Sequence, residues 1–449
     1  MFIGRDSELK TLNEYRERGG NQILVLYGKA GIGKTTLLKQ FMEQTKDTFY
    51  LECLALSERE QLFQWTSILA KQHPDIPAYS TYQDIFSCAL GKKVLIFDEF
   101  QHLLKNSVSF IDTLFSFLLS SEQDYFVILC SSSLEWIENS MIHRIGAKAK
   151  LLSGFLKLRD LTFQDFMKYF KNFTFEECIE GYAILGGVPY LWEQFSQNKS
   201  LKDNIVETIL SPQSVLFDYG EQFVARQLRE TAVYNSILCA LASGVKKLND
   251  LYLHTGFSRA KISVYLKNLM ELGIVYKEFS YDTDGRENVQ KGIYGIADHY
   301  VDFTYQFLFP YKQERREMNR ADFYETRILP YRKEYTARYF AVIFKEYMEL
   351  QNQTGRLPIS CNKMGKWIGK AGTIDFIGQN EEQKTILGLC NWERPMMRYD
   401  DYEWLLFCAK QAKLQADYVY LFSAEGFDEK LRFAAASRQN IYLLTLTDL

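Results

Sequence analysis

The residues best suited to chemistry form one glycine-rich segment that matches the pattern GxxxxGK[ST], Gly28-Lys29-Ala30-Gly31-Ile32-Gly33-Lys34-Thr35. An apolar run precedes it and a helical pattern begins at Thr36. Glycines at this spacing let backbone N–H groups turn toward phosphate oxygens, and the start of a helix adds the positive end of its dipole. We therefore predict that residues 28–36 bind nucleotide phosphates, with Lys34 at the terminal phosphates and Thr35 on magnesium. An ordinary glycine-rich turn between a strand and a helix is the alternative.

Two carboxylates, Asp98 and Glu99, end the apolar run Val94-Leu95-Ile96-Phe97. We expect Asp98 to hold magnesium through water and Glu99 to polarise the water that attacks the γ-phosphate. GTPases usually position that water with a glutamine, so the acid at 99 favours ATP. The alternative is that the pair merely ends a buried strand.

Two further candidates follow along the chain. Ser131, Ser132 and Ser133 come after the apolar run 125–130, where a hydroxyl could contact the γ-phosphate or the attacking water; serines are also ordinary turn and cap residues. Arg144 follows a short helical stretch and is a candidate arginine finger, acting on its own or a neighbouring subunit. A solvated arginine is the alternative there.

The elements that must position these residues alternate up to about residue 160. Strands predicted at 23–27, 49–53, 93–97 and 126–130 are interleaved with helices, which indicates a parallel sheet covered on both faces. From 161 to about 209 the pattern is helical, with Phe163, Phe166 and Phe170 spaced for one helix face.

Residues 231 to 310 have a winged-helix pattern. Helices are expected at 236–242, 247–254 and 258–272, then strands at 274–279 and 292–296, separated by a polar turn that starts at Asp282 and ends at Asp284-Gly285. Between residues 246 and 277 six basic residues stand against two acidic ones, which can neutralise DNA phosphates. We predict duplex DNA contacts by Arg259, Lys261 and Lys267 on the third helix, with protein docking as the alternative.

The remaining residues predict a second α/β domain. A helix at 335–350 precedes strands at 372–377 and 385–390, a helix at 402–413, a strand at 418–422, a helix at 427–438 and a strand at 441–446. The expected divisions are 1–160, 161–210, 211–310 and 311–449.

Composition limits the class of protein. A chain of 449 residues with 47% hydrophobic and 24% charged residues is folded, and its net charge of -3 gives no global reason to bind nucleic acid or membranes. The eight cysteines contain no CxxC pair and read as buried thiols in a reducing compartment. With no signal sequence or membrane span recognised, we expect a cytoplasmic protein.

Three stretches carry a family resemblance: Phe2-Ile3-Gly4-Arg5-Asp6-Ser7-Glu8-Leu9, Ile96-Phe97-Asp98-Glu99-Phe100-Gln101 and Gly186-Gly187-Val188-Pro189-Tyr190-Leu191. Together they resemble the archaeal-type ATPases, a branch of the AAA+/STAND P-loop NTPases. The resemblance implies a P-loop ATPase core with a helical lid, then a winged helix, then a restriction-endonuclease-like α/β domain. It also implies that Gly186-Gly187 orients the lid over the nucleotide.

The nuclease chemistry of such a C-terminal domain is not expected here. A PD-(D/E)XK centre needs an Asp on one strand, then an acid and a Lys two positions apart on the next strand. Asp375 fits the first position, but Leu389 and Asn391 occupy the other two. Ala341 stands where the family has a Glu after a Phe, and Glu346 is a candidate replacement. We predict a degenerate site that does not cut DNA.

The predicted activity is hydrolysis of ATP with magnesium, coupled to a DNA-binding winged helix. The alternative is a STAND-type switch that retains nucleotide with little turnover, binds proteins and does not bind DNA. The expected partners are ATP or ADP and duplex DNA, with no membrane; self-association into a homo-oligomer is left open.

Overall fold

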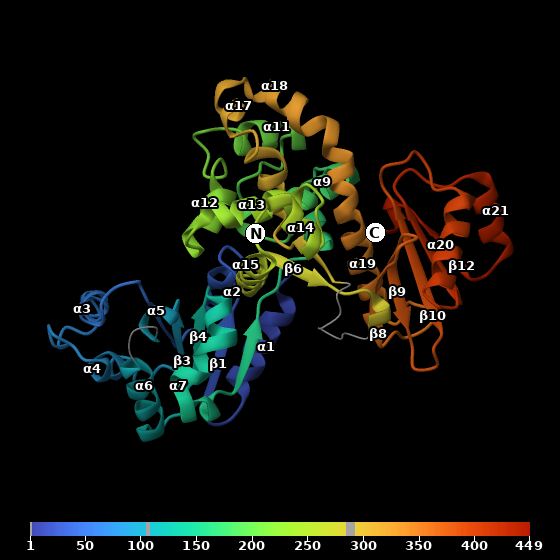
Figure 1. The fold of residues 1–449 in the computed structure, drawn as a ribbon. Helices are drawn as coiled ribbons and strands as arrows, with labels where there is room; N and C mark the ends of the chain where they lie inside the picture. The colour runs from blue at the N-terminus through green and yellow to red at the C-terminus, as the bar shows by residue number, and fades with distance from the viewer. Residues whose placement is uncertain (1, 105–107, 284–291) are drawn as a thin grey trace. The chain divides into compact units, whose positions relative to one another are not determined.

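The computed structural model in Figure 1 describes residues 2–104, 108–283 and 292–449. These residues form two compact units. Unit 1 comprises Met1–Leu161 and Val188–Tyr190, and unit 2 comprises Thr162–Gly187 and Leu191–Leu449. Within the described ranges, no helix is both long and apolar enough to cross a lipid bilayer. The domain divisions at 160, 210 and 310 remain predictions.

Unit 1 is built on a parallel five-stranded sheet in the order β2-β3-β4-β1-β5. Its strands are β1 (Gln22–Tyr27), β2 (Thr48–Glu52), β3 (Val94–Asp98), β4 (Phe126–Ser131) and β5 (Gly154–Lys157). Since all five are parallel, their carboxyl ends meet at one edge of the sheet. The predicted parallel sheet is confirmed, whereas β5 was not predicted because its residues alternate between exposed and half-buried.

Helices cover both faces of this sheet, because successive side chains of each strand point to opposite faces. Residues such as Leu24 and Ile96 pack under α1 and α2, and residues such as Val25 and Phe97 pack under α3, α4 and α6. The helices are α1 (Asp6–Glu17), α2 (Lys34–Glu43), α3 (Glu58–Leu69), α4 (Tyr82–Ser87), α5 (Gln101–Leu104), α6 (Ser109–Ser120) and α7 (Met141–Ile145).

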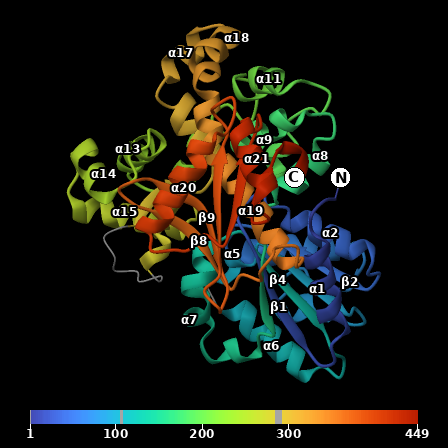
Figure 2. The ribbon, with the colours of Figure 1, turned by 90° about the vertical axis from the view of Figure 1, so that its right-hand side faces the viewer.

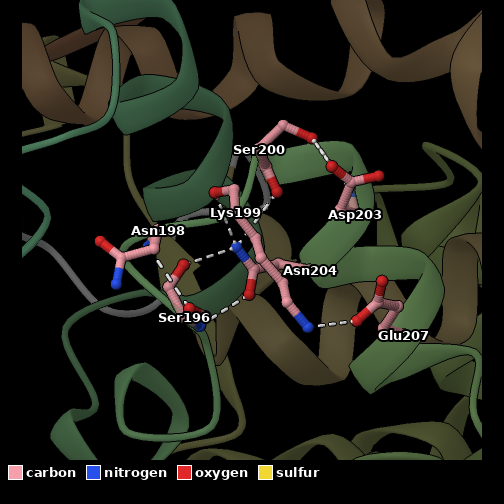
Figure 3. A network of polar contacts seen from close by, with 7 residues as sticks. All are labelled: Ser196, Asn198, Lys199, Ser200, Asp203, Asn204 and Glu207. Atoms are coloured by element: carbon pink, nitrogen blue, oxygen red, sulfur yellow. Dashed lines mark hydrogen bonds and ion pairs between the residues drawn. The ribbon is translucent and has the colours of Figure 1, made fainter.

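Unit 2 begins with short helices in the region predicted to be helical: α8 (Phe163–Tyr169), α9 (Phe175–Leu185), α10 (Pro189–Trp192, which starts in unit 1) and α11 (Leu201–Asn204). The predicted face of Phe163, Phe166 and Phe170 is buried. The connection into α11 is organised by Asn204, whose amide donates to the carbonyls of Ser196, Lys199 and Ser200, as Figure 3 shows. The Asn204 side chain, which is 1% exposed, thus supplies hydrogen-bond donors to carbonyl groups of this loop.

The winged helix is present in unit 2. It consists of α12 (Tyr219–Gln227), α13 (Thr231–Ala242), α14 (Leu248–Thr255), α15 (Arg259–Glu271), β6 (Val275–Glu278) and β7 (Ile293–Ile296). The two strands pair antiparallel, and α13 to α15 share one apolar core with them. Asp282 lies in a short 3-10 turn, while Asp284 and Gly285 of the predicted polar turn lie outside the described residues.

A helical connection follows, formed by α16 (His299–Phe303), α17 (Lys312–Glu317), α18 (Arg320–Phe323) and the long α19 (Arg332–Gln353). The second sheet of unit 2 has the order β12-β11-β10-β9-β8, with β10, β11 and β12 parallel and β8, β9 and β10 antiparallel. Its elements are β8 (Lys363–Ile368), β9 (Thr373–Gln379), β10 (Thr385–Asn391), α20 (Tyr399–Gln411), β11 (Tyr418–Ser423), α21 (Glu429–Ser437) and β12 (Ile441–Leu444).

This sheet lies between two helical layers. The rings of Phe340 and Phe344 on α19 stack against Phe422 on one face, and α20 and α21 pack on the other face. Figure 1 shows the layers edge-on, and Figure 2 shows α20 and α21 in front of the strands. The predicted fold class, a P-loop core followed by a winged helix and a second α/β domain, is confirmed. β8 escaped prediction because only Trp367 among its residues is buried.

Candidate functional site

The phosphate-binding loop runs from the end of β1 to the start of α2, at the carboxyl edge of the unit 1 sheet. Gly31 and Gly33 have φ angles of 78° and 93°, which side-chain-bearing residues rarely adopt. These angles turn the loop so that α2 begins directly after Gly33. All residues predicted to bind phosphate, from Gly28 to Thr36, therefore lie on one continuous loop and helix N-terminus.

Lys34 is folded against this loop. Its Nζ donates hydrogen bonds to the carbonyl oxygens of Gly28 at 2.9 Å and Lys29 at 3.1 Å, and the residue is only 5% exposed. A buried ammonium group needs such partners, because an unpaired charge away from water is very costly. The cation is thus held at the centre of the loop where an anionic group is expected.

Asp98, at the end of β3, is the acceptor that joins the loop to the rest of the sheet. Its Oδ2 accepts hydrogen bonds from the hydroxyls of Thr35 and Tyr50, both at 3.0 Å, and its Oδ1 accepts from the Glu99 amide at 3.0 Å. Burial and the nearby Asp98 carboxylate raise the pKa of Tyr50, which keeps its hydroxyl protonated as a donor. Thr35 and Asp98, the two predicted magnesium ligands, are in direct contact.

Glu99 has a positive φ of 56°, an uncommon and costly conformation for a glutamate. Its Oε2 accepts hydrogen bonds from the hydroxyl of Ser132 at 2.6 Å, from the Ser132 amide at 3.2 Å and from the Gln101 side chain. Ser132 follows β4, which lies between β1 and β3, so the serine segment flagged from the sequence contacts the predicted general base. Ser131 and Ser133 instead hydrogen-bond each other.

Arg144 is the predicted site residue that the structure does not link to this cluster. It is exposed on α7, and its Nε donates to the carbonyl oxygen of Leu104 at 3.1 Å. Nothing in its contacts assigns it to the phosphate loop of its own chain, so the arginine-finger hypothesis stays a prediction.

Two contacts that support the loop were not assigned a role from the sequence. Arg5 is 5% exposed, and its guanidinium donates to the carbonyl oxygens of Ile32 at 3.1 Å and Arg159 at 2.7 Å. The Tyr190 amide donates to the Gly31 carbonyl oxygen at 3.2 Å. Both residues belong to stretches that carried the family resemblance, which was the available signal. The three hydrogen bonds span 27, 154 and 159 positions of sequence, so no local pattern reveals them.

The size of a cavity does not identify this site. A cavity of about 580 Å³ is lined by residues that include Gln22, Lys93 and Phe126, at the amino ends of β1, β3 and β4. It therefore lies at the opposite edge of the sheet from the phosphate loop. The chemistry of the loop, and not the volume, marks the candidate site.

The donor set of the loop fits a magnesium nucleotide. Turned backbone N–H groups, a helix N-terminus and the Lys34 ammonium are complementary to phosphate oxygens. The Thr35 hydroxyl and the Asp98 carboxylate are oxygen ligands of the kind that Mg²⁺ prefers, and it completes its shell with phosphates and water.

The winged helix carries a groove of about 460 Å³ between the starts of α14 and α15 and the two strands of the wing. Lys247, Arg259 and Lys277 line it, and none of its described lining residues is acidic. Arg259, one of the three residues predicted to contact DNA, therefore lines this groove with two lysines that were not selected, and its contact with DNA stays a prediction. Lys261 instead covers the rings of Phe257 and Tyr265, and Lys267 pairs with Glu271 at 3.7 Å.

The C-terminal sheet places Asp375 on β9, where its Oδ2 accepts from the Cys390 amide at 3.1 Å. Leu389 and Asn391, at the positions of the missing acid and lysine, are buried in the fold. A lysine is nevertheless present: Lys366 of β8 lies 3.6 Å from Asp375, which sequence reasoning missed because β8 was not predicted.

Glu346 does not provide the missing acid. Its two oxygens accept hydrogen bonds from the Phe163 amide at 2.9 Å and the Tyr182 hydroxyl at 2.7 Å, on the helical segment of unit 2. Its suggested role as a replacement is therefore corrected to a structural one.

Three family models match the chain. An ATPase domain predominantly from Archaea matches residues 2–67, the arsR family of bacterial regulatory proteins matches residues 235–277, and archaeal and bacterial proteins of unknown function match residues 304–403. These segments correspond to the start of unit 1, to the helices of the winged helix with β6, and to the stretch from the end of α16 to the start of α20.

Two proteins of Methanocaldococcus jannaschii are similar in sequence. An uncharacterized protein is 27% identical over 392 residues, which is 86% of each chain. An uncharacterized ATP-binding protein is 37% identical over 46 residues, 10% of this chain and 78% of that protein.

Solved structures with similar folds include the Aeropyrum pernix ORC2 protein and a STAND protein with a tetratricopeptide repeat sensor from Pyrococcus horikoshii. The first has a TM-score of 0.43 and 14% identity, covering 67% of this chain and 91% of that one. The second has a TM-score of 0.30 and 16% identity, covering 78% and 50%. At these TM-scores the likeness carries no argument about function.

The fold, the site and the family matches define a nucleotide-binding ATPase of the P-loop class with a helix-turn-helix domain. More narrowly, the chain has the architecture of the archaeal-type ATPases with a winged helix, as the resemblance implied.

A glycine pair tests the geometry of the loop. A Cβ added at Gly31 would lie 2.9 Å from the Tyr190 Cβ, whereas one added at Gly91, with a similar φ of 82°, meets nothing within 4 Å. Both alanine variants share a backbone penalty of about 1–2 kcal/mol in unfolding free energy. We expect Gly31→Ala to weaken ATP binding by about tenfold or more, because it also displaces the loop, and Gly91→Ala to leave it unchanged. Equal affinities in calorimetric titrations would contradict the packing described.

Proposed function

We propose that this protein binds ATP with magnesium and hydrolyses it. The observation that carries the proposal is the contact between Thr35 and Asp98, because it joins the two halves of a magnesium-nucleotide site from separate strands. Bound magnesium would supply charge neutralisation at the phosphate oxygens. Lys34 would bind the terminal phosphates and Glu99 would accept a proton from the attacking water.

Glu99 also bears on the rate of turnover. One of its oxygens already accepts hydrogen bonds from Ser132 and Gln101, so fewer acceptor positions of the carboxylate are left for the attacking water. This arrangement favours slow turnover. It therefore also supports a second candidate function, a nucleotide switch in which the bound nucleotide, and not its hydrolysis, sets the state of the protein. Steady-state hydrolysis distinguishes them: sustained turnover supports the ATPase, and retained ADP supports the switch.

Two substitutions test nucleotide chemistry. We expect Lys34→Ala to weaken ATP binding by about a hundredfold, since it removes charged hydrogen bonds to the phosphates. Glu99→Gln should keep binding and lower turnover by about 100-fold or more, because an amide cannot accept the proton. Binding of a fluorescent ATP analogue and release of inorganic phosphate measure the two effects. Unchanged affinity in Lys34→Ala would show that the loop is not the nucleotide site.

We propose further that the nucleotide state is coupled to the winged helix through the chain itself. The chain leaves unit 1 after Leu161, returns to it for Val188–Tyr190 and leaves again. The returning segment is hydrogen-bonded to Gly31 of the phosphate loop. A change in this loop would thus act on α10, which begins inside the segment, and on α9, which ends shortly before it.

The winged helix is proposed to bind duplex DNA through the groove that Lys247, Arg259 and Lys277 line. Three cations in one groove, with no acidic residue among its described lining residues, suit a phosphate backbone better than a protein surface of mixed charge.

Salt dependence tests this DNA contact. We expect Lys247→Ala/Lys277→Ala to reduce the slope of log affinity against log salt concentration by about 1.8, since each phosphate contact contributes about 0.9. The matched control is Lys410→Ala/Lys413→Ala, which removes two exposed lysines of the C-terminal domain. The same slope in all three proteins, measured by fluorescence anisotropy on a 24-base-pair duplex, would rule out the groove.

The C-terminal domain is proposed to be a scaffold without nuclease activity. Burial raises the pKa of Asp375, and the Lys366 ammonium beside it opposes this shift and supplies a positive charge where a metal ion would otherwise neutralise the carboxylate. One carboxylate paired with a lysine is a poor site for a hard divalent ion.

Plasmid relaxation tests the scaffold proposal. We expect the wild type and Asp375→Asn to leave supercoiled plasmid intact with ATP and either Mg²⁺ or Mn²⁺. Nicking by the wild type that is lost in Asp375→Asn would mean that the domain is an active nuclease.

A further inference from the structure

Helix α15 of the winged helix presents an unusual set of side chains outward. Ile262, Leu266 and Leu269 are fully buried and fix the orientation of the helix. The opposite face is formed by residues spaced three and four apart, which therefore lie side by side. These exposed residues are Ala260, Ser263, Val264 and Lys267.

The long side chains of α15 that could recognise purines are engaged elsewhere. Bidentate contacts to guanine or adenine are made by Arg, Lys, Asn or Gln side chains. Arg259 contacts Asn249 and lies over the Tyr252 ring, at the groove. Asn268 donates to the Tyr234 hydroxyl at 2.7 Å, on the inner side of the helix. Lys267, on the outward face, pairs with Glu271 at the end of the helix.

What remains at the centre of the outward face is short and apolar. Val264 is 57% exposed, and Ala260 lies one turn before it. Short side chains let a helix approach the base edges in the major groove closely. The group that an exposed methyl or isopropyl side chain can recognise there is the C5-methyl of thymine, which no other unmodified DNA base carries.

Charge on both sides of this face favours DNA as its occupant over protein. Arg259 and Lys261 lie at the start of the helix, and Lys267 lies near its end beside Glu271, so a helix held against two phosphate strands would place Val264 between cations. An apolar protein partner would gain nothing from these three cations.

We propose that α15 recognises DNA by contact of Val264, supported by Ala260, with thymine methyl groups. The proposal rests on the DNA binding proposed above and extends it to base preference. Specificity then comes from shape and methyl contacts in A·T-rich major grooves, and Val264 is the specificity-determining residue.

The test removes the methyl group from the DNA and leaves the protein intact. Two 24-base-pair duplexes, alternating d(AT) and alternating d(AU), have the same Watson–Crick hydrogen bonds and differ only at C5. We expect the wild-type full-length protein to bind d(AT) more tightly, by roughly fourfold for each contacted thymine, the change that burial of one methyl group produces.

Variants then assign the effect to a residue. Val264→Ser should lose most of the preference for d(AT), whereas Leu253→Ser, the same kind of change at a 70% exposed position of α14, should keep the full preference. Both positions are on the surface, and circular dichroism verifies that each variant is folded.

The outcomes distinguish recognition of thymine methyl groups from DNA binding itself. Binding to both duplexes with equal affinity in the wild type overturns methyl recognition and leaves DNA binding standing. Persistence of the preference in Val264→Ser overturns the role of that residue. No binding to either duplex overturns the proposed DNA-binding function together with this inference.

Discussion

The nucleotide site depends on the hydrogen bonds that the buried carboxylate of Asp98 accepts. It is only 3% exposed, so its charge is stabilised by the hydroxyls of Thr35 and Tyr50 and by the Glu99 amide. These donors come from α2, from β2 and from the turn after β3. One acceptor thus fixes the register between three elements, and loss of the carboxylate would deprive the hydroxyls of Thr35 and Tyr50 of this acceptor.

The same edge of the sheet explains why Ser132 and Glu99 meet. In a parallel sheet the chain leaves every strand at the same edge, and β4 lies between β1 and β3. The residue that follows β4 must therefore lie between the phosphate loop and Glu99, the predicted general base. The positive φ of Glu99 turns its side chain toward that neighbour, and its cost is offset by the hydrogen bonds that the carboxylate accepts.

Much of this arrangement could be predicted because its determinants are local. The strand, glycine-rich turn and helix around Lys34 are contiguous, and Asp98 and Glu99 directly follow four apolar residues. Contacts between distant segments could not be predicted. Arg5 binds carbonyls at 32 and 159, and carbonyl groups have no signature in a sequence.

The strands β5 and β8 were missed for a related reason. Neither has the run of apolar residues that marks a buried strand: no residue of β5 is buried, and Trp367 is the single buried residue of β8. Because β8 was not predicted, the contact between Lys366 and Asp375 could not be predicted either. In the winged helix the basic residues could be counted, but which of them line the groove depends on how α14, α15 and the two strands pack together.

The return of the chain to unit 1 at Val188–Tyr190 bears on how such a protein can be divided and recombined in evolution. A fragment that ends at Leu161 contains every motif residue of the nucleotide site, yet it lacks the segment that is hydrogen-bonded to the phosphate loop. The ATPase unit is therefore discontinuous in sequence. Recombination that exchanges one continuous stretch of sequence between relatives cannot transfer the whole ATPase unit. The phosphate loop and the helices around residue 189 must therefore be inherited together.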